Sequence, residues 1–168
     1  MRRLFFSLLV VMPLMAMAQM KLAVVDVQAI FNAMPAAQAS QQVLSERSHY
    51  FEQEYKSMQD DFNAKYAAYQ KLNADPATPP SILKRRTQEI QEDNAKIDAF
   101  LNSGKTELDQ LKLKLEQPIY QQINDAIKAV ASEQGLTYVL DVSRTPLCYT
   151  GSDAIDITGA CLSKLGIK

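Results

Sequence analysis

The sequence predicts a mainly α-helical protein in which a long antiparallel pair of helices projects from a small β-containing body. Residues 36–74 contain neither Gly nor Pro, and their apolar side chains recur at alternating spacings of three and four, as in a coiled-coil seam. A Pro-rich stretch at 75–80 separates them from a second segment with the same spacing. We therefore assign 36–116 to a helical hairpin with its tip near 75–80.

The N-terminus has the pattern of a secretory signal peptide. Arg2 and Arg3 precede an unbroken run of mostly apolar residues at 4–15, and the small-residue motif Ala-Met-Ala follows at 16–18. The run is too short to span a bilayer, which takes ~20 residues. We expect residues 1–18 to be a signal peptide cleaved after Ala18, and the protein to be exported.

The body is predicted to comprise residues 19–35 and 117–168. Its first element is a strand in the apolar, β-branched segment 21–26, which ends in Asp26. Asp is a favoured N-cap, so a short helix should begin at Val27. Pro35 breaks this helix and suits the first turn of the next one.

The first long helix carries its seam on one stripe. Seven of nine seam positions hold apolar residues, and the intervening residues are mostly soluble helix formers. The d positions are Leu44, Phe51, Met58, Lys65 and Leu72, and the a positions are Ser48, Tyr55, Phe62 and Tyr69.

The second long helix follows the turn, with Thr78 or Ser81 as its expected cap. Two such seams joined by a short turn fold back on each other. The second seam is Leu83, Ile90, Asn94, Ile97, Leu101, Gly104, Leu108, Leu111 and Leu115. The poorly packing Ser48, Lys65, Asn94 and Gly104 have two interpretations: they let the arm bend, or the polar ones fix its register.

The C-terminal part of the body should mix helix and strand. Pro118 is expected to kink the returning helix, which stops at Gly135. A strong strand is predicted in 136–142, a short one at Leu147–Tyr149, and a final helix capped by Asp156.

So small a body should need a partner or a staple. We expect it to oligomerise through its strands, with Val24, Val25, Tyr138, Val139 and Leu140 as the candidate residues. Cys148 and Cys161 are the only cysteines. In an exported protein they form either a disulfide or two buried thiols.

Composition and motifs argue against catalysis and nucleic-acid binding. Without residues 1–18 the chain has 16 basic and 19 acidic residues, a net charge of −3, so no basic face is predicted to hold phosphates. The only His, His49, lies outside the seam and is expected to be exposed. With no phosphate loop, metal-ligand pattern or nucleophile motif, we expect no enzyme, metal or cofactor.

Three segments carry a family resemblance: KLAVVDVQAIF at 21–31, INDAIKAVASEQGLTYVLDVS at 123–143 and CYTGSDAIDIT at 148–158. In this order and spacing they resemble the Skp/OmpH family of periplasmic chaperones. The resemblance implies a jellyfish-shaped homotrimer whose helical tentacles enclose a cavity. It also implies a holdase that binds unfolded outer-membrane proteins without ATP and prevents their aggregation. The alternative is a structural coiled-coil scaffold or tether in the cell envelope.

Client binding would need apolar side chains outside the seam. The candidates are Tyr50, Tyr66, Phe100 and Leu113, although Tyr66 and Phe100 are also placed to widen the seam. A basic cluster near the tip consists of Lys71, Lys84, Arg85 and Arg86. It predicts a weak contact with an anionic membrane or lipopolysaccharide, or it is simply a solvated helix start. Well-known relatives are strongly basic, whereas this chain is acidic.

Overall fold

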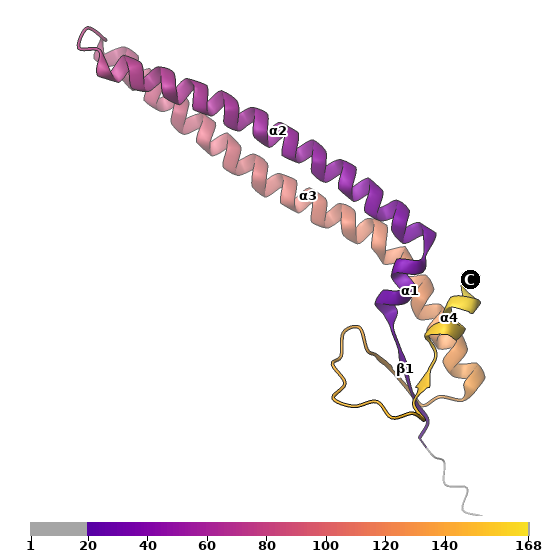
Figure 1. The fold of residues 1–168 in the computed structure, drawn as a ribbon. Helices are drawn as coiled ribbons and strands as arrows, with labels where there is room; N and C mark the ends of the chain where they lie inside the picture. Colours follow the sequence, from indigo (N-terminus) through magenta and orange to yellow (C-terminus); the bar gives the residue numbers. More distant parts are fainter. Residues whose placement is uncertain (1–19, 168) are drawn as a thin grey trace, which may run out of the picture.

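The computed structural model of the protein describes residues 20–167 and consists of a long two-helix arm on a small body (Figure 1). The predicted signal peptide, residues 1–18, lies outside the described residues. In chain order the elements are β1 (Leu22–Val25), α1 (Val27–Ala33), α2 (Pro35–Ala74), α3 (Pro80–Gln134), β2 (Tyr138–Asp141), β3 (Ile155–Asp156) and α4 (Thr158–Lys164). The fold class predicted from the sequence is confirmed.

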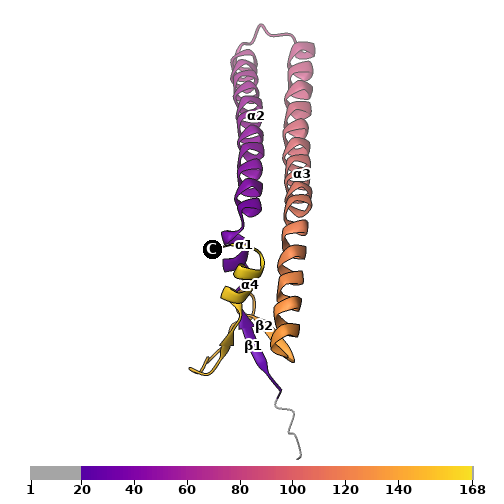
Figure 2. The same cartoon turned by 90° about the vertical axis from the view of Figure 1, so that its right-hand side faces the viewer.

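The arm is formed by α2 and the first part of α3, which run antiparallel and side by side (Figures 1 and 2). The 40 residues of α2 correspond to a length of roughly 60 Å at 1.5 Å per residue. The other helix, α3, is longer at 55 residues, and its C-terminal part belongs to the body. One continuous helix therefore connects the tip of the arm to the sheet.

The tip is a short turn held by Asp75. The Asp75 side chain accepts a hydrogen bond from the Ala77 N–H at 2.9 Å, and its carbonyl accepts one from the Thr78 N–H at 3.0 Å. The N-cap of α3 is Pro79, with Pro80 as the first helical residue, so the prediction of a Thr78 or Ser81 cap was wrong. Proline suits a helix start because its fixed φ is already helical and the missing N–H has no partner there.

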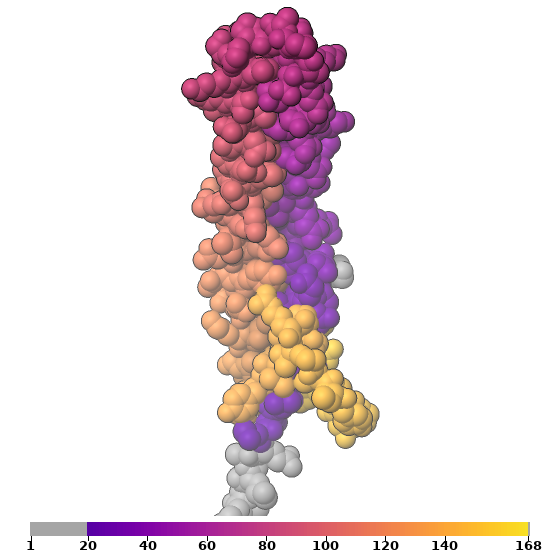
Figure 3. Space-filling model, turned by 90° about the vertical axis from the view of Figure 1, so that its left-hand side faces the viewer, coloured from indigo at the N-terminus to yellow at the C-terminus, as the bar shows by residue number. Residues whose placement is uncertain are grey.

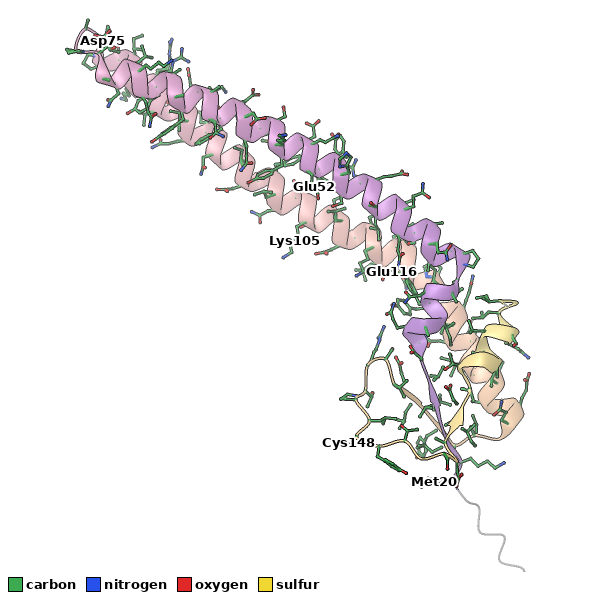
Figure 4. The ribbon with its side chains drawn as sticks, in the orientation of Figure 1. Met20, Glu52, Asp75, Lys105, Glu116 and Cys148 are labelled. Atoms are coloured by element: carbon green, nitrogen blue, oxygen red, sulfur yellow. The ribbon has the colours of Figure 1, made fainter. Side chains whose placement is uncertain are left out.

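Pro118 lies inside α3, and the helix continues through it. Figure 1 shows α3 changing direction where it passes from the arm into the body. Glu116, labelled in Figure 4, lies at this junction. Proline removes one hydrogen bond of the helical ladder, which is a recognised cause of bending.

The sheet has the strand order β2-β1-β3, and both pairs are parallel. Leu22 is in register with Tyr138, and Ala23 with Ile155. The third strand is thus at Ile155–Asp156, and the prediction of a strand at Leu147–Tyr149 was wrong. Residues 147–149 belong to an irregular loop just after Pro146, and a two-residue strand leaves almost no local pattern to recognise.

The hydrophobic core lies in the body, between the sheet and the helices. Its largest fully buried side chains come from four elements and from the residue before α4. They are Val25, Ile30, Ile123, Ile157 and Cys161. The arm has few fully buried residues: in the part of the hairpin beyond Ser40, only Gly104 is buried.

The caps of α1 and α4 fix how the strands lead into helices. As expected, the Asp26 side chain accepts a hydrogen bond from the Ala29 N–H at 2.8 Å. Asp156 was expected to cap α4, but the N-cap is Ile157, which makes no side-chain cap bond. The Asp156 side chain instead accepts a hydrogen bond from the N–H of Thr158, the first helical residue, at 2.8 Å. The Asp26 N–H donates to the Thr158 hydroxyl at 2.9 Å, which connects the two ends of the chain directly.

Candidate functional site

An aromatic cluster joins the two helices midway along the arm. The rings of Phe51 on α2 and Phe100 on α3 have centroids 5.5 Å apart, and Tyr50 approaches Phe51 edge-on at 5.8 Å. The Arg47 guanidinium lies 4.8 Å from the Tyr50 ring centroid and 4.9 Å from that of Phe51. Arg47 Nε also donates to Glu107 Oε1 at 2.8 Å. The Phe51–Phe100 ring contact and the Arg47–Glu107 ion pair thus connect α2 to α3 at this level, and the cation–π contacts hold the Arg47 side chain in place within α2.

Gly104 allows the two helices to approach at this cluster. A Cβ at this position would lie 2.9 Å from Cδ1 of Phe51, which is closer than real contacts allow. Gly104 is the one fully buried position of the arm's middle. Its role is close packing against an aromatic ring.

A groove of about 320 Å³ opens beside this cluster. We call it the mid-arm groove. Its apolar lining consists of Phe51, Tyr55, Phe100, Leu101 and Leu108, and the charged residues at its edge are Glu52, Lys105 and Asp109. Figure 4 labels Glu52 on α2 and Lys105 on α3, both in the middle stretch of the arm.

Three of the four proposed client-binding side chains are exposed on the arm. Tyr50 is 46% exposed, Tyr66 44% and Leu113 69%. Tyr66 also stacks on Phe62, with ring centroids 6.2 Å apart. The fourth, Phe100, packs against Phe51, which fits the second interpretation of this residue, that it widens the seam.

At two places in α3, the side chain turned toward α2 is one residue earlier in the sequence than the predicted seam residue. Leu101 was assigned to the seam but is 45% exposed, and its neighbour Phe100 faces α2 instead. Likewise Asn94 is exposed and Asp93 is half-buried. Spacings of three and of four residues both keep a side chain on the same face of a helix. The sequence alone therefore did not determine in which order these spacings follow one another along α3.

The seam residue Lys65 bonds to Asp93 across the arm. Lys65 Nζ lies 2.5 Å from Asp93 Oδ2, and Lys96 Nζ lies 3.2 Å from Asp93 Oδ1. The hydrogen bonds from Lys65 and then Lys96 hold the pKa of Asp93 below its ordinary value. The bond to Asp93 raises the pKa of Lys65. This polar contact fits one relative position of the two helices, as register-fixing residues do.

The basic cluster near the tip is partly neutralised within α3. Arg86 Nη1 lies 2.6 Å from Glu89 Oε2, and Arg85 Nε lies 3.6 Å from Glu89 Oε1. Lys71 and Lys84 are exposed on different helices. Glu89 was not considered in the sequence interpretation, and it leaves less free positive charge at the tip than the four basic residues alone suggest.

The two cysteines occupy different environments and are not bonded to each other. Cys161 is completely buried in the core, and burial together with nearby Asp156 raises the pKa of its thiol. Cys148 is exposed on the loop before β3. Neither of the two expected arrangements, a disulfide or two buried thiols, describes this pair.

Large apolar side chains are exposed on the body. Leu22 is 51% exposed and its register partner Tyr138 57%, so both lie on one face of the sheet. That face is opposite to the one from which Ala23 and Val25 enter the core. Figure 3 shows the C-terminal residues, in yellow, against the base of the arm.

Nothing within residues 20–167 suggests a metal centre or a membrane span. In this range no group of three or more His, Cys, Asp or Glu side chains is arranged to hold a metal ion. None of its helices is both long and apolar enough to cross a bilayer. His49 is exposed, with Nδ1 3.9 Å from Glu52 Oε2.

Residues 21–165 match the sequence family described as Outer membrane protein (OmpH-like). The chain belongs to this family. Two similar proteins are each named Chaperone protein Skp. The one from Photorhabdus laumondii is 31% identical over 141 residues, covering 82% of each chain. The one from Photorhabdus luminescens is 31% identical over 153 residues, covering 89% of this chain and 88% of its own.

The fold is also that of a solved OmpH-like protein from Caulobacter crescentus. The two structures superpose with a TM-score of 0.64 at 16% sequence identity, covering 86% of this chain and 83% of the other. The predicted family is confirmed by the family match and by the two relatives. So is the expectation of a non-enzymatic protein, because both named relatives are chaperones.

The mid-arm groove was missed by the sequence interpretation. The signal for it was Gly104, a glycine inside a long helix, where it costs up to about 1 kcal/mol relative to alanine. We treated that glycine as a packing defect rather than as a close approach. The contacts of Arg47 were also missed, because an Arg beside the seam normally remains solvated.

Proposed function

We propose that the protein is a periplasmic holdase that binds unfolded outer-membrane proteins without ATP and prevents their aggregation. The observation that carries this proposal is the slender arm, which exposes aromatic and aliphatic side chains such as Tyr50 and Leu113, in a family whose named relatives are chaperones. Such contacts are individually weak and add up through effective concentration. A weak hold suits a protein that must release its client without an energy source.

The working form in this proposal is a homotrimer joined through the strands. The exposed sheet face at Leu22 and Tyr138 supports self-association, because apolar patches of this kind commonly mark interfaces. The number three comes from the family resemblance. Three arms would then surround a space for the client. The tip residues Lys71 and Lys84 would add only a weak contact with membrane or lipopolysaccharide.

The direct test is aggregation of several denatured β-barrel proteins after dilution from urea, followed by light scattering. The protein without residues 1–18 should suppress scattering of each client in the absence of nucleotide. The triple variant Tyr50→Gln, Tyr66→Gln, Leu113→Gln should suppress it less at equal concentration. The triple variant Gln53→Ala, Gln59→Ala, Gln110→Ala, at exposed polar positions of the arm, serves as the control.

The competing proposal is an envelope scaffold or tether. A scaffold would bind one folded partner in a fixed ratio and leave the scattering of denatured clients unchanged.

Mass measurement of the protein with and without client reports its oligomeric state and client binding together. Tyr138→Glu should lower the mass of the free protein if the sheet face joins the subunits. A mass unchanged by Tyr138→Glu would go against that face.

A further inference from the structure

The mid-arm groove has the size and lining of a site for individual side chains. Its volume is about 320 Å³, at the lower end of the range for small-ligand pockets. A folded partner would need an interface of at least ~1,000 Å², which a groove of this size does not offer. A segment of unfolded chain can place one or two side chains in it.

The lining favours aromatic occupants. The side chains of Phe51, Phe100 and Tyr55 contribute rings to its wall, and Leu101, 45% exposed, forms an accessible apolar edge. Rings gain extra attraction from edge-to-face and offset contacts with other rings. An aliphatic side chain would gain only from the burial of its surface.

The charged residues at the edge of the groove determine which residues are favoured next to the bound aromatic side chain. Glu52 and Asp109 contribute two carboxylates and Lys105 a single ammonium group, and all three residues are exposed. A chain with Lys or Arg next to its aromatic residue would meet a net negative edge. An anionic lipid surface would be repelled from it.

We propose that the mid-arm groove binds aromatic side chains flanked by basic residues in unfolded polypeptides. The proposal rests on the holdase function and gives it a sequence preference. Clients would be held first at such segments, while the exposed side chains elsewhere on the arm add unselective contacts.

The composition of the protein provides a direct optical test, because it contains no Trp. The fluorescence of a short Lys-Trp-Lys peptide therefore reports only on the peptide, and its emission shifts to the blue when the ring leaves water. We expect the protein to shift this emission and to bind a Glu-Trp-Glu peptide about fivefold more weakly at low salt. The preference should fade near 1 M salt, where the Debye length is about 3 Å.

Four variants separate the groove from the rest of the arm. Leu101→Gln should weaken Lys-Trp-Lys binding by at least about threefold through lost apolar contact. Its matched control is Val43→Gln at the base of the arm, because Val43 is 44% exposed and lies outside the groove. Glu52→Gln should reduce the preference for basic flanks. Glu54→Gln, at an exposed position outside the groove, should leave it unchanged.

The outcomes distinguish this site from the general function. No blue shift with a protein that still suppresses client aggregation would overturn the groove and leave the holdase intact. A shift that Leu101→Gln does not weaken, or equal binding of both peptides, would also overturn the groove. A Leu101-dependent shift in a protein that fails to suppress aggregation would support the groove and reject the holdase.

Discussion

The ring of Phe51 occupies the space that a side chain at position 104 would need. A glycine inside a helix loses roughly 0.5–1 kcal/mol relative to alanine. Gly159, in α4, has nothing within 4 Å of the position its Cβ would take. We therefore expect the two glycines to respond differently to replacement by alanine.

We predict that Gly104→Ala destabilises the protein by about 1 kcal/mol. The added methyl group would lie 2.9 Å from the Phe51 ring, and overpacking costs about 1–3 kcal/mol, more than the gain in helix propensity. Gly159→Ala should be neutral or stabilising. Urea denaturation followed by circular dichroism measures both, and a stabilised Gly104→Ala protein would contradict the role given to this glycine.

The two thiols provide a second test at the scale of residues. Cys161 is fully buried and its pKa is raised, so its thiol should remain protonated and unreactive in the native protein. Cys148 is exposed. Ellman's reagent at pH 8 should modify one thiol per chain in the native state and two after denaturation. Cys148→Ser should abolish the native reaction, and two fast native thiols would contradict the buried position of Cys161.

The arm depends on polar contacts to align its helices. Asp93 on α3 bonds to Lys65 on α2 at 2.5 Å and to Lys96 at 3.2 Å. Its pKa is lowered by these bonds. The stabilisation from the Asp93 charge is therefore fully present above its unfolded pKa of about 3.9 and is lost as pH falls through the lower folded value.

We predict that Asp93→Asn lowers the urea midpoint at pH 7 and that its difference from the parent protein shrinks below about pH 4. The pKa of Lys65 is raised in the folded protein. At high pH the Lys65–Asp93 pair should therefore stabilise the fold until the pH exceeds this raised pKa. Asp60→Asn, at an exposed position of α2, is the control. An effect of Asp93→Asn that stays equal from pH 7 to pH 3 would show that charge is not its cause.

Sequence reasoning succeeded best for the long elements. The regular spacing and the Pro-rich turn were enough to predict the two helices, and Asp26 was enough to predict the start of α1. It failed for β3, whose two residues pair with β1 through contacts distant in sequence. It also failed for Leu101, which is exposed while its neighbour Phe100 packs against Phe51, because which of the two faces the seam depends on how α2 approaches.

The same limit applies to the candidate site. Tyr50, Tyr66 and Leu113 could be recognised as exposed side chains because they lie off the apolar stripe. The mid-arm groove could not, because it is formed jointly by two helices around Gly104. Glu89 lies only three and four residues from Arg86 and Arg85, so this neutralisation was visible in the sequence.

Taken as a whole, the molecule distributes its buried surface unevenly. The core residues gather in the body, and most seam residues of the arm are only half-buried. Local opening is easiest where few apolar contacts hold a segment. The arm and the body should therefore differ in stability although α3 belongs to both.

We predict that amide hydrogen exchange is slow in β1 and in α3 residues 119–130, and fast in α2 and α3 near the tip. The contact between Lys65 and Asp93 should appear as a local increase in protection. Mass spectrometry of peptides after timed labelling measures this profile. Uniformly slow exchange along the arm would contradict an arm that adapts to clients.

The sheet order also has a consequence for how the chain acquires its structure. The first strand has no neighbour until the last part of the chain arrives, since it pairs only with β2 and β3 among the described residues. Local helical contacts form quickly, whereas distant strand pairing is slow. The hairpin should thus assemble before the sheet, and until the last residues are in place the protein itself would be an incomplete chain with an unpaired, aggregation-prone strand.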